Sequence, residues 1–281
     1  MQRMRIAPIS VIIPCYCCSQ VLPRAVNSVL RQSLLPAEII LVDDASTDQG
    51  DTKRCIEEIV SSHLTSRGDV RIRSHYLENN QGPGGARNAA WDIASERYVA
   101  FLDADDSWAP KKLEIQYDWM LNHPEFTLSS HESQHIDDAG RPLCHCPISH
   151  VEIHGLFLVF KNVIPTRSVM LVNRPEFRFP PAMRYAEDYW LWLNMAMRGI
   201  RMAKINVPLA FMYKSDFGEG GLSCNLRAMH SGVLKCYLDL RHQRLIGPVT
   251  YWFGCILERI KYLKRVIISR ARLGRLLTGD Q

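Results

Sequence analysis

The sequence lacks the long apolar runs that anchor proteins in membranes or direct them out of the cell. Its 281 residues contain no stretch of about 18 uncharged apolar residues, which argues against a classical membrane span. No apolar signal region precedes the first predicted strand, because Met1–Ile6 leads straight into it. We therefore expect a cytoplasmic protein, and a basic tail leaves open peripheral attachment to the inner face of the cytoplasmic membrane.

The cysteines are not expected to form a disulfide framework. There are nine, an odd number, in a chain far longer than a small disulfide-stapled domain, so reduced thiols are favoured over disulfides or a zinc site. Internal repeats and low-complexity segments are also missing. With 47% hydrophobic and 22% charged residues, the composition fits one large globular domain, or one domain with an appendage.

Positive charge is concentrated at the C-terminal end. Residues 241–281 contain nine Lys and Arg and two acids, a net charge of +7, whereas the whole chain carries +5, so residues 1–240 sum to −2. We therefore divide the chain into a main domain over 1–240 and a basic helical tail over 241–281. No known nucleic-acid-binding module accompanies this charge, so a nucleic-acid partner is not expected.

The tail has the pattern of an amphipathic helix. Residues 245–257 are thirteen uncharged residues with an aromatic cluster, too short to span a bilayer. Apolar and basic residues then mix over 259–275, which is typical of a helix lying on a membrane surface. The alternative is a helix that packs its apolar face onto the main domain.

Apolar runs alternate with helical periodicity over the first hundred residues. Strands are predicted over 9–13, 38–42, 70–77 and 98–102, with helices over 20–31, 51–65 and 86–94 and a breaker-rich loop over 79–85. This alternation predicts an α/β fold with a mostly parallel sheet flanked by helices. Farther along, the pattern predicts helices near 110–122 and 186–198 and strands near 126–136 and 167–172.

Two carboxylates directly follow the fourth predicted strand. Asp103 and Asp105 flank Ala104 at the end of the apolar run 98–102. Because open α/β sheets bind ligands beyond the carboxyl ends of their strands, these side chains are expected at a binding rim. Carboxylate oxygens suit a hard divalent cation that completes its shell with waters and phosphates. The triplet therefore predicts a site for a metal ion and a diphosphate.

Similar groups stand at other predicted strand ends and at one helix start. The five motifs are Val11–Tyr16, Leu41–Asp48, Asn80–Asn88, Phe101–Asp106 and Ala186–Trp190. Through them, over roughly residues 8–223, the chain resembles the family 2 glycosyltransferases, which have the GT-A fold. The resemblance implies inverting transfer of a sugar from a nucleotide-diphosphate sugar, with a uridine donor favoured. The implied acceptor is a hydroxyl of a glycan or lipid-linked glycan in polysaccharide or glycolipid synthesis.

The resemblance assigns the nucleotide-sugar contacts. Pro14 and Tyr16 would offer backbone groups and a ring to the nucleotide, and Asp44 would accept a hydrogen bond from the imide of a pyrimidine. Arg87 could form a charge-assisted contact with the diphosphate. For Asp43 and Asp44 the alternative is structural, and one of the two is expected to act as a helix cap or in an Asx-turn.

The acids after strand four and before the later helix receive the remaining roles. Asp105 is the predicted ligand of Mn²⁺ or Mg²⁺, with Asp103 as a further ligand or near the ribose. Asp106 is the family's common third acid and a candidate cap for the helix near Pro110. Asp188 is the predicted general base for the acceptor hydroxyl, and Glu187 is its partner. The alternative for the last two is that they are first-turn acids stabilising a helix.

Other interpretations remain open at this point. A sugar nucleotidyltransferase would carry a glycine-rich loop with Arg and Lys after the first strand, where this chain has Pro14-Cys15-Tyr16. A catalytically inactive glycan-binding or scaffold protein would not need all five motifs. The Gln-x-x-Arg-Trp motif of processive synthases is absent, which favours transfer of a single sugar.

Two further segments have alternative interpretations. His131–His135 matches a zinc-protease pattern, but its surroundings predict a strand instead of the required helix. The glycine-rich segment 214–223 is predicted as a loop that closes over the donor or as an ordinary connector.

Overall fold

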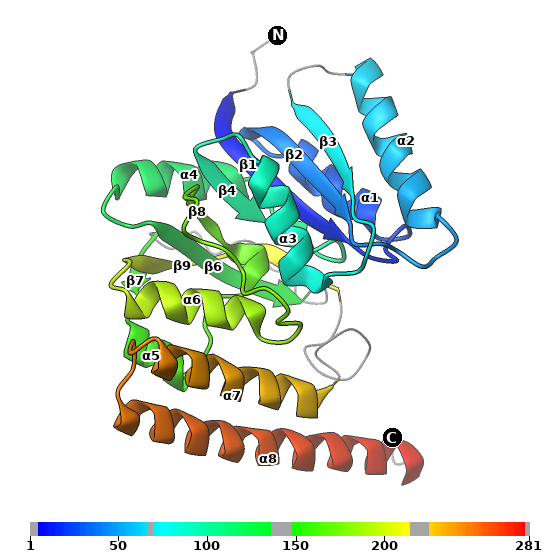
Figure 1. The fold of residues 1–281 in the computed structure, drawn as a ribbon. Helices are drawn as coiled ribbons and strands as arrows, with labels where there is room; N and C mark the ends of the chain where they lie inside the picture. The colour runs from blue at the N-terminus through cyan, green and yellow to red at the C-terminus, as the bar shows by residue number, and fades with distance from the viewer. Residues whose placement is uncertain (1–4, 67–69, 136–147, 214–224, 279–281) are drawn as a thin grey trace.

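The computed structural model describes residues 5–66, 70–135, 148–213 and 225–278, and its centre is one mixed β-sheet covered by helices (Figure 1). The sheet has the strand order β3-β2-β1-β4-β8-β6-β9-β5, and β7 pairs with β9. The strands are β1 (Ile6–Cys15), β2 (Leu35–Asp43), β3 (Arg71–Tyr76), β4 (Tyr98–Phe101), β5 (Ser107–Trp108), β6 (Leu128–His135), β7 (His150–Glu152), β8 (Met170–Val172) and β9 (Met202–Met212). The helices are α1 (Leu22–Leu30), α2 (Asp51–Ser66), α3 (Gly82–Ile93), α4 (Lys112–Asn122), α5 (Gly155–Phe160), α6 (Glu187–Met197), α7 (Leu226–His242) and α8 (Pro248–Thr278), with a 3₁₀ turn over Thr166–Ser168.

The first four strands run parallel, as the sequence predicts. The register pairs Cys15 with Asp43 and Ile12 with Phe101, so the carboxyl ends of β1, β2 and β4 meet at one edge of the sheet. Their apolar runs are buried on both faces, which is why they read as continuous rather than alternating. Antiparallel pairings of β8, β5 and β7 make the second half of the sheet mixed. The α/β fold class is confirmed.

One predicted boundary is wrong. The segment 79–85 is not all loop, because α3 already begins at Gly82. Pro83 stands in the first turn of a helix, where a residue without an N–H group is tolerated. Gly82 has φ of +77°, which a glycine adopts without strain. The breakers therefore start the helix instead of preceding it.

Strand β6 contains the His131–His135 pattern, so the strand prediction for this segment is confirmed. Strand β9 was not predicted, since Lys204, Asn206 and Pro208 interrupt its apolar residues. The glycine-rich segment 214–223 lies outside the described residues, so its predicted closing role stays a prediction.

The C-terminal helices form two further layers below α6 (Figure 1). Val233 and Tyr237 of α7, together with Ile246 and Cys255, belong to the same buried cluster as Trp192 of α6. The proposed division at residue 240 falls inside α7, and it stays a prediction. In the described part of the chain, every helix is too short or too polar to cross a bilayer.

Candidate active site

The carboxyl ends of β1 and β2 bring the first two motifs together. Tyr16 is 47% exposed directly after β1, and its hydroxyl lies 3.4 Å from the hydroxyl oxygen of Thr47 after β2. Pro14, one residue before the end of β1, pairs with Val42 in β2. An exposed ring at the rim of the sheet is available to stack on a planar base, so the geometry is compatible with the predicted nucleotide contact.

The two aspartates at the end of β2 both accept structural hydrogen bonds. Asp43 Oδ1 accepts from the backbone N–H of Ser46 at 3.2 Å and from its hydroxyl at 2.5 Å, which closes the turn after the strand. Asp44 Oδ1 accepts from the backbone N–H of Gln81 at 2.7 Å, at the start of α3. Burial raises the pKa of Asp44 above its ordinary value. The turn role expected for one of the pair is thus confirmed for Asp43, and the base contact of Asp44 stays a prediction.

Arg87 joins the motif that contains Asp103 to the motif that contains Glu187, and Glu187 lies 100 residues from Arg87 in the sequence. From the middle of α3 it donates to Asp103 Oδ1 at 2.6 Å and to Glu187 Oε1 at 3.0 Å. Its side chain is only 7% exposed. Burial alone would lower the pKa of Arg87, but the carboxylates of Asp103 and Glu187 raise it above its ordinary value. Arg87 therefore stays charged and fixes the end of β4 against the start of α6.

Space for this ion-pair network depends on a glycine. A Cβ atom on Gly84 would lie 2.9 Å from Glu187 Cγ, closer than carbon atoms approach without displacement. Residue 84 can therefore carry no side chain while Glu187 keeps its position. This explains one glycine of the breaker-rich segment by packing and not by turn geometry.

Glu187 and Asp188 open α6 after a residue in an unusual conformation. Ala186 has φ of +59°, in the left-handed region that residues with a Cβ seldom occupy. Its carbonyl accepts from the Cys236 thiol, and the side chain is buried, so packing holds it there. Backbone strain of this kind is concentrated at functional sites.

The two carboxyl groups differ in their partners. Asp188 Oδ2 accepts from the Thr166 hydroxyl at 3.1 Å, and Oδ1 accepts from its neighbouring backbone N–H, that of Tyr189, at 2.7 Å. Burial raises the pKa of Asp188 above its ordinary value, although the charge of Arg87 and both hydrogen bonds act to lower it. Burial, followed by the like charge of Asp188, raises the pKa of Glu187 to about 7. A carboxylate with a raised pKa and fixed orientation is suited to accept a proton near neutral pH.

The acids after β4 form a crowded negative group. Asp103 and Asp105 are partly exposed, whereas Asp106 is buried and pairs with Arg167 at 3.2 Å. Burial raises the pKa of Asp106 to about 7, Arg167 opposes this, and the charges of Asp103 and Asp105 add to it. The proposed capping role of Asp106 is wrong, because its carboxylate is held by Arg167 and α4 begins only at Lys112 without a side-chain cap.

The chemistry of this acidic group fits a divalent cation. The donors are carboxylate oxygens at an open rim, and their mutual repulsion is what a cation would relieve. Three or more potential ligands do not gather at any point among the described residues. A cation bound at this rim would be held by one or two carboxylates together with substrate phosphates.

Three supporting residues carried no signal in the sequence. Thr166 orients Asp188, Arg167 neutralises Asp106, and Arg24 of α1 donates to the backbone oxygen of Asp105 at 2.6 Å. None of them lies in one of the five motifs, and their partners are 22 to 81 residues away. Only the folded chain reveals them.

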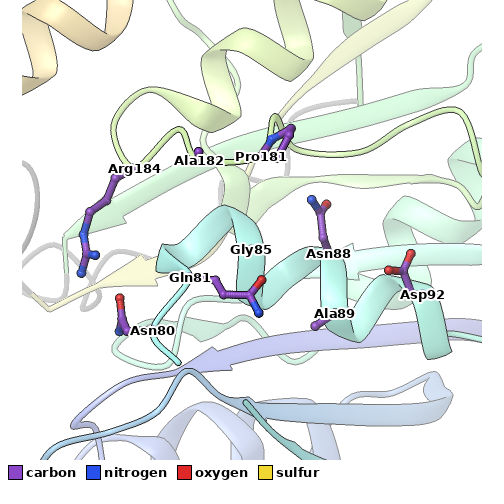
Figure 2. Close-up of a pocket in the computed structure, with 9 residues that line it drawn as sticks. All are labelled: Asn80, Gln81, Gly85, Asn88, Ala89, Asp92, Pro181, Ala182 and Arg184. Carbon is purple, nitrogen blue, oxygen red and sulfur yellow. The ribbon is translucent and has the colours of Figure 1, made fainter. Parts of the chain in front are cut away.

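A pocket of about 630 Å³ opens beside Asp44, between α3 and the segment 181–184 (Figure 2). Asn80 at its edge donates to the Asp44 backbone oxygen at 2.9 Å. Arg184 extends from the opposite wall toward Asn80. The side chains at its walls are mainly polar, and they belong to Asn80, Gln81, Asn88, Ala89, Asp92, Pro181, Ala182 and Arg184, with Gly85 completing the lining.

Comparison with solved structures identifies the fold. S. aureus TarS (residues 1–349), crystallised with UDP-GlcNAc, superposes with a TM-score of 0.62 at 20% sequence identity, over 83% of this chain and 66% of that one. The mannosyltransferase PcManGT from Pyrobaculum calidifontis, in complex with GDP-Man and Mn²⁺, gives 0.61 at 16% identity, over 98% of this chain and 83% of that one. The fold is that of the GT-A glycosyltransferases.

Sequence comparison then gives the family. Residues 10–156 match the sequence model of glycosyl transferase family 2. The Escherichia coli protein WfaP, a UDP-Glc:alpha-D-GlcNAc-diphosphoundecaprenol beta-1,3-glucosyltransferase, is 33% identical over 245 residues, which are 85% of this chain and 90% of WfaP. The chain belongs to glycosyltransferase family 2, and the resemblance inferred from its five motifs is confirmed.

Proposed function

We propose that this glycosyltransferase transfers a single sugar from a UDP-sugar to a hydroxyl of a lipid-linked glycan, with inversion at the anomeric carbon. A relative whose name specifies a UDP-Glc donor and a diphosphoundecaprenol-linked acceptor supports both substrate classes. The UDP-GlcNAc complex of a protein with the same fold supports the donor class again.

The observation that carries the proposal is the position of Arg87. It connects Asp103, in the acidic group proposed to face the donor diphosphate, with Glu187, the neighbour of the proposed base. Donor and acceptor chemistry must occur within a few ångströms for a direct displacement. One buried guanidinium ensures that the two halves of the site, contributed by distant segments, stay at a fixed separation.

The reaction follows from the groups present. Asp188 takes the proton of the acceptor hydroxyl while that oxygen forms a bond to the anomeric carbon. The bond between this carbon and the diphosphate oxygen breaks, and UDP leaves with its electron pair. Attack from the face opposite UDP inverts the configuration. Thr166 and the backbone N–H of Tyr189 hold the Asp188 carboxylate in place during proton transfer.

Other residues bind and orient the donor. Tyr16 and Asp44 would contact the uracil base, with Pro14 offering its backbone at the same edge. Asp105, with Asp103, would hold Mn²⁺ or Mg²⁺. When bound, the ion supplies positive charge that stabilises the leaving diphosphate. Arg87 adds positive charge from the protein itself at the same position.

The experiment is incubation of the full chain with a panel of UDP-, GDP- and dTDP-sugars and a polyprenyl-diphosphate GlcNAc acceptor. Release of UDP with a mass gain of one sugar on the acceptor supports the proposal, and NMR of the product reports the anomeric configuration. Release of inorganic diphosphate would indicate a nucleotidyltransferase. Donor binding without product would favour an inactive glycan-binding protein. Asp188→Asn is the matched control, because an asparagine keeps the shape of the aspartate and can keep its hydrogen bonds with Thr166 and with the Tyr189 N–H.

A further inference from the structure

The outermost helix, α8, exposes a continuous apolar stripe. Apart from the adjacent pair Trp252 and Phe253, its members recur every three or four residues, so they share one face of the helix over about 27 Å. Each is between 44% and 81% exposed. The members of this stripe are Val249, Trp252, Phe253, Ile256, Ile260, Leu263 and Ile267. Large apolar residues this closely spaced on a surface mark an interaction site.

This stripe is not the face with which α8 packs on the protein. The opposite face buries Gly254, Cys255 and Glu258 against α7. A Cβ atom on Gly254 would lie 3.1 Å from the ring of Tyr237, so the two helices are in close contact there. Glu258, buried in this interface, pairs with Arg265 and with His230 of α7. The helix is therefore fixed by one face and presents the other outward (Figure 1).

Helix α5 extends the apolar surface sideways. The ring of Phe160 lies 5.0 Å, centroid to centroid, from that of Phe253. Leu156 and Phe157 of the same helix are also exposed. The Lys261 ammonium donates to the backbone oxygen of Phe160 and attaches α5 to α8. The stripe and these three α5 residues form one surface, called the apolar face below.

The charges around the apolar face are positive. Arg259 and Lys264 are exposed, and at about 100° per residue they project at the two margins of the stripe. The one acid between residues 245 and 278 is Glu258, which is buried and paired. Two copies meeting through this face would place cations against cations, which disfavours a symmetric dimer. An apolar stripe with cationic margins instead complements acyl chains beneath anionic headgroups.

We propose that the apolar face docks the protein on the surface of an anionic lipid bilayer, with α8 lying in the plane of the membrane. Trp252 and Phe253 would enter the headgroup boundary, where aromatic side chains are favoured. Arg259 and Lys264 would contact lipid phosphates. The proposal is independent of the proposed sugar transfer, because it rests on a surface that contains none of the active-site residues.

The test is flotation of the full chain with phosphatidylcholine vesicles, with and without phosphatidylglycerol, in the absence of donor and acceptor. Removing the tail would expose the buried side of α7, so point variants are used instead. Trp252→Gln, Ile256→Gln and Ile260→Gln together should abolish flotation. Leu121→Gln with Val151→Gln, which are exposed apolar positions on other elements, should leave it unchanged.

A second variant separates binding from folding. Arg259→Gln with Lys264→Gln keeps the apolar face and should weaken partition onto phosphatidylglycerol vesicles about 30-fold. The proposal is overturned if the unmodified chain floats with neither kind of vesicle. It is overturned as well if the triple variant floats to the same extent as the unmodified chain. It is also overturned if light scattering shows a dimer that the triple variant dissociates while vesicles bind neither form.

Discussion

Replacing Asp188 by Asn tests the proposed base with little structural disturbance. The change removes the negative charge that accepts the proton but keeps the shape of the side chain. The amide oxygen can still accept from the Tyr189 N–H, and the Thr166 hydroxyl can rotate to accept from the new NH₂ group. We therefore expect the free energy of unfolding to change by less than about 1 kcal/mol.

Turnover should fall much further than stability. Loss of a general base lowers kcat by about 100-fold or more, which corresponds to about 2.7 kcal/mol in the activation barrier. The Kd for UDP-sugar should stay within about threefold of the original, because the donor contacts proposed for Asp44 and Asp105 are untouched. Titration calorimetry with UDP and a UDP-release assay measure the two quantities separately.

The pH profile adds an internal check. Asp188 must be ionised to act as base, and burial raises its pKa, so kcat of the unmodified enzyme should fall as pH decreases through that pKa. Its like charge also helps to raise the pKa of Glu187 to about 7, and in Asp188→Asn the Glu187 pKa should move down. Near-normal kcat in the variant would refute the assignment and make Glu187 the first alternative base.

Three further outcomes are expected from other features of the structure. Asp105→Ala should remove the Mn²⁺ dependence of UDP binding, measured by calorimetry, and unchanged dependence would place the ion elsewhere. Arg87→Met leaves Glu187 buried without its partner and should lower the free energy of unfolding by about 3 kcal/mol at about pH 8. The loss should be smaller at about pH 6, because the raised Glu187 pKa lets the folded state hold a proton there; equal losses at both pH values in urea titrations would contradict this. Gly232→Ala places a Cβ 2.5 Å from the Tyr185 backbone oxygen and should cost about 1–3 kcal/mol, whereas Gly247→Ala, with open space around it, should be near neutral in the same unfolding assay.

The sequence alone was sufficient for the fold class and for one edge of the site. Buried parallel strands are continuous apolar runs, and the polar motifs stand directly after them, so both signals are local. Parallel pairing then brings the ends of β1, β2 and β4 together without further information. For that reason the positions of Tyr16, Asp44 and Asp103 at a common rim could be predicted.

Tertiary structure decided which partners these residues have. Arg87 contacts Glu187 across 100 residues, and Thr166 contacts Asp188 from a turn without a motif. Asp106 looked like a helix cap, yet burial beside Arg167 gives it a different partner. Such pairings depend on how segments that are distant in the sequence pack together, which no local pattern encodes.

The same limit applies to the C-terminal helix. Its sequence shows apolar residues among basic ones, and two interpretations, a membrane surface or packing on the main domain, fit that pattern equally. Periodicity indicates that apolar faces exist but not which face meets the rest of the protein. The structure shows that Cys255 and Glu258 turn inward while Trp252 and Ile260 turn outward. Only the contact with α7 distinguishes the buried face of the helix from the exposed one, because burial depends on the neighbours that a residue meets and not on the residue itself.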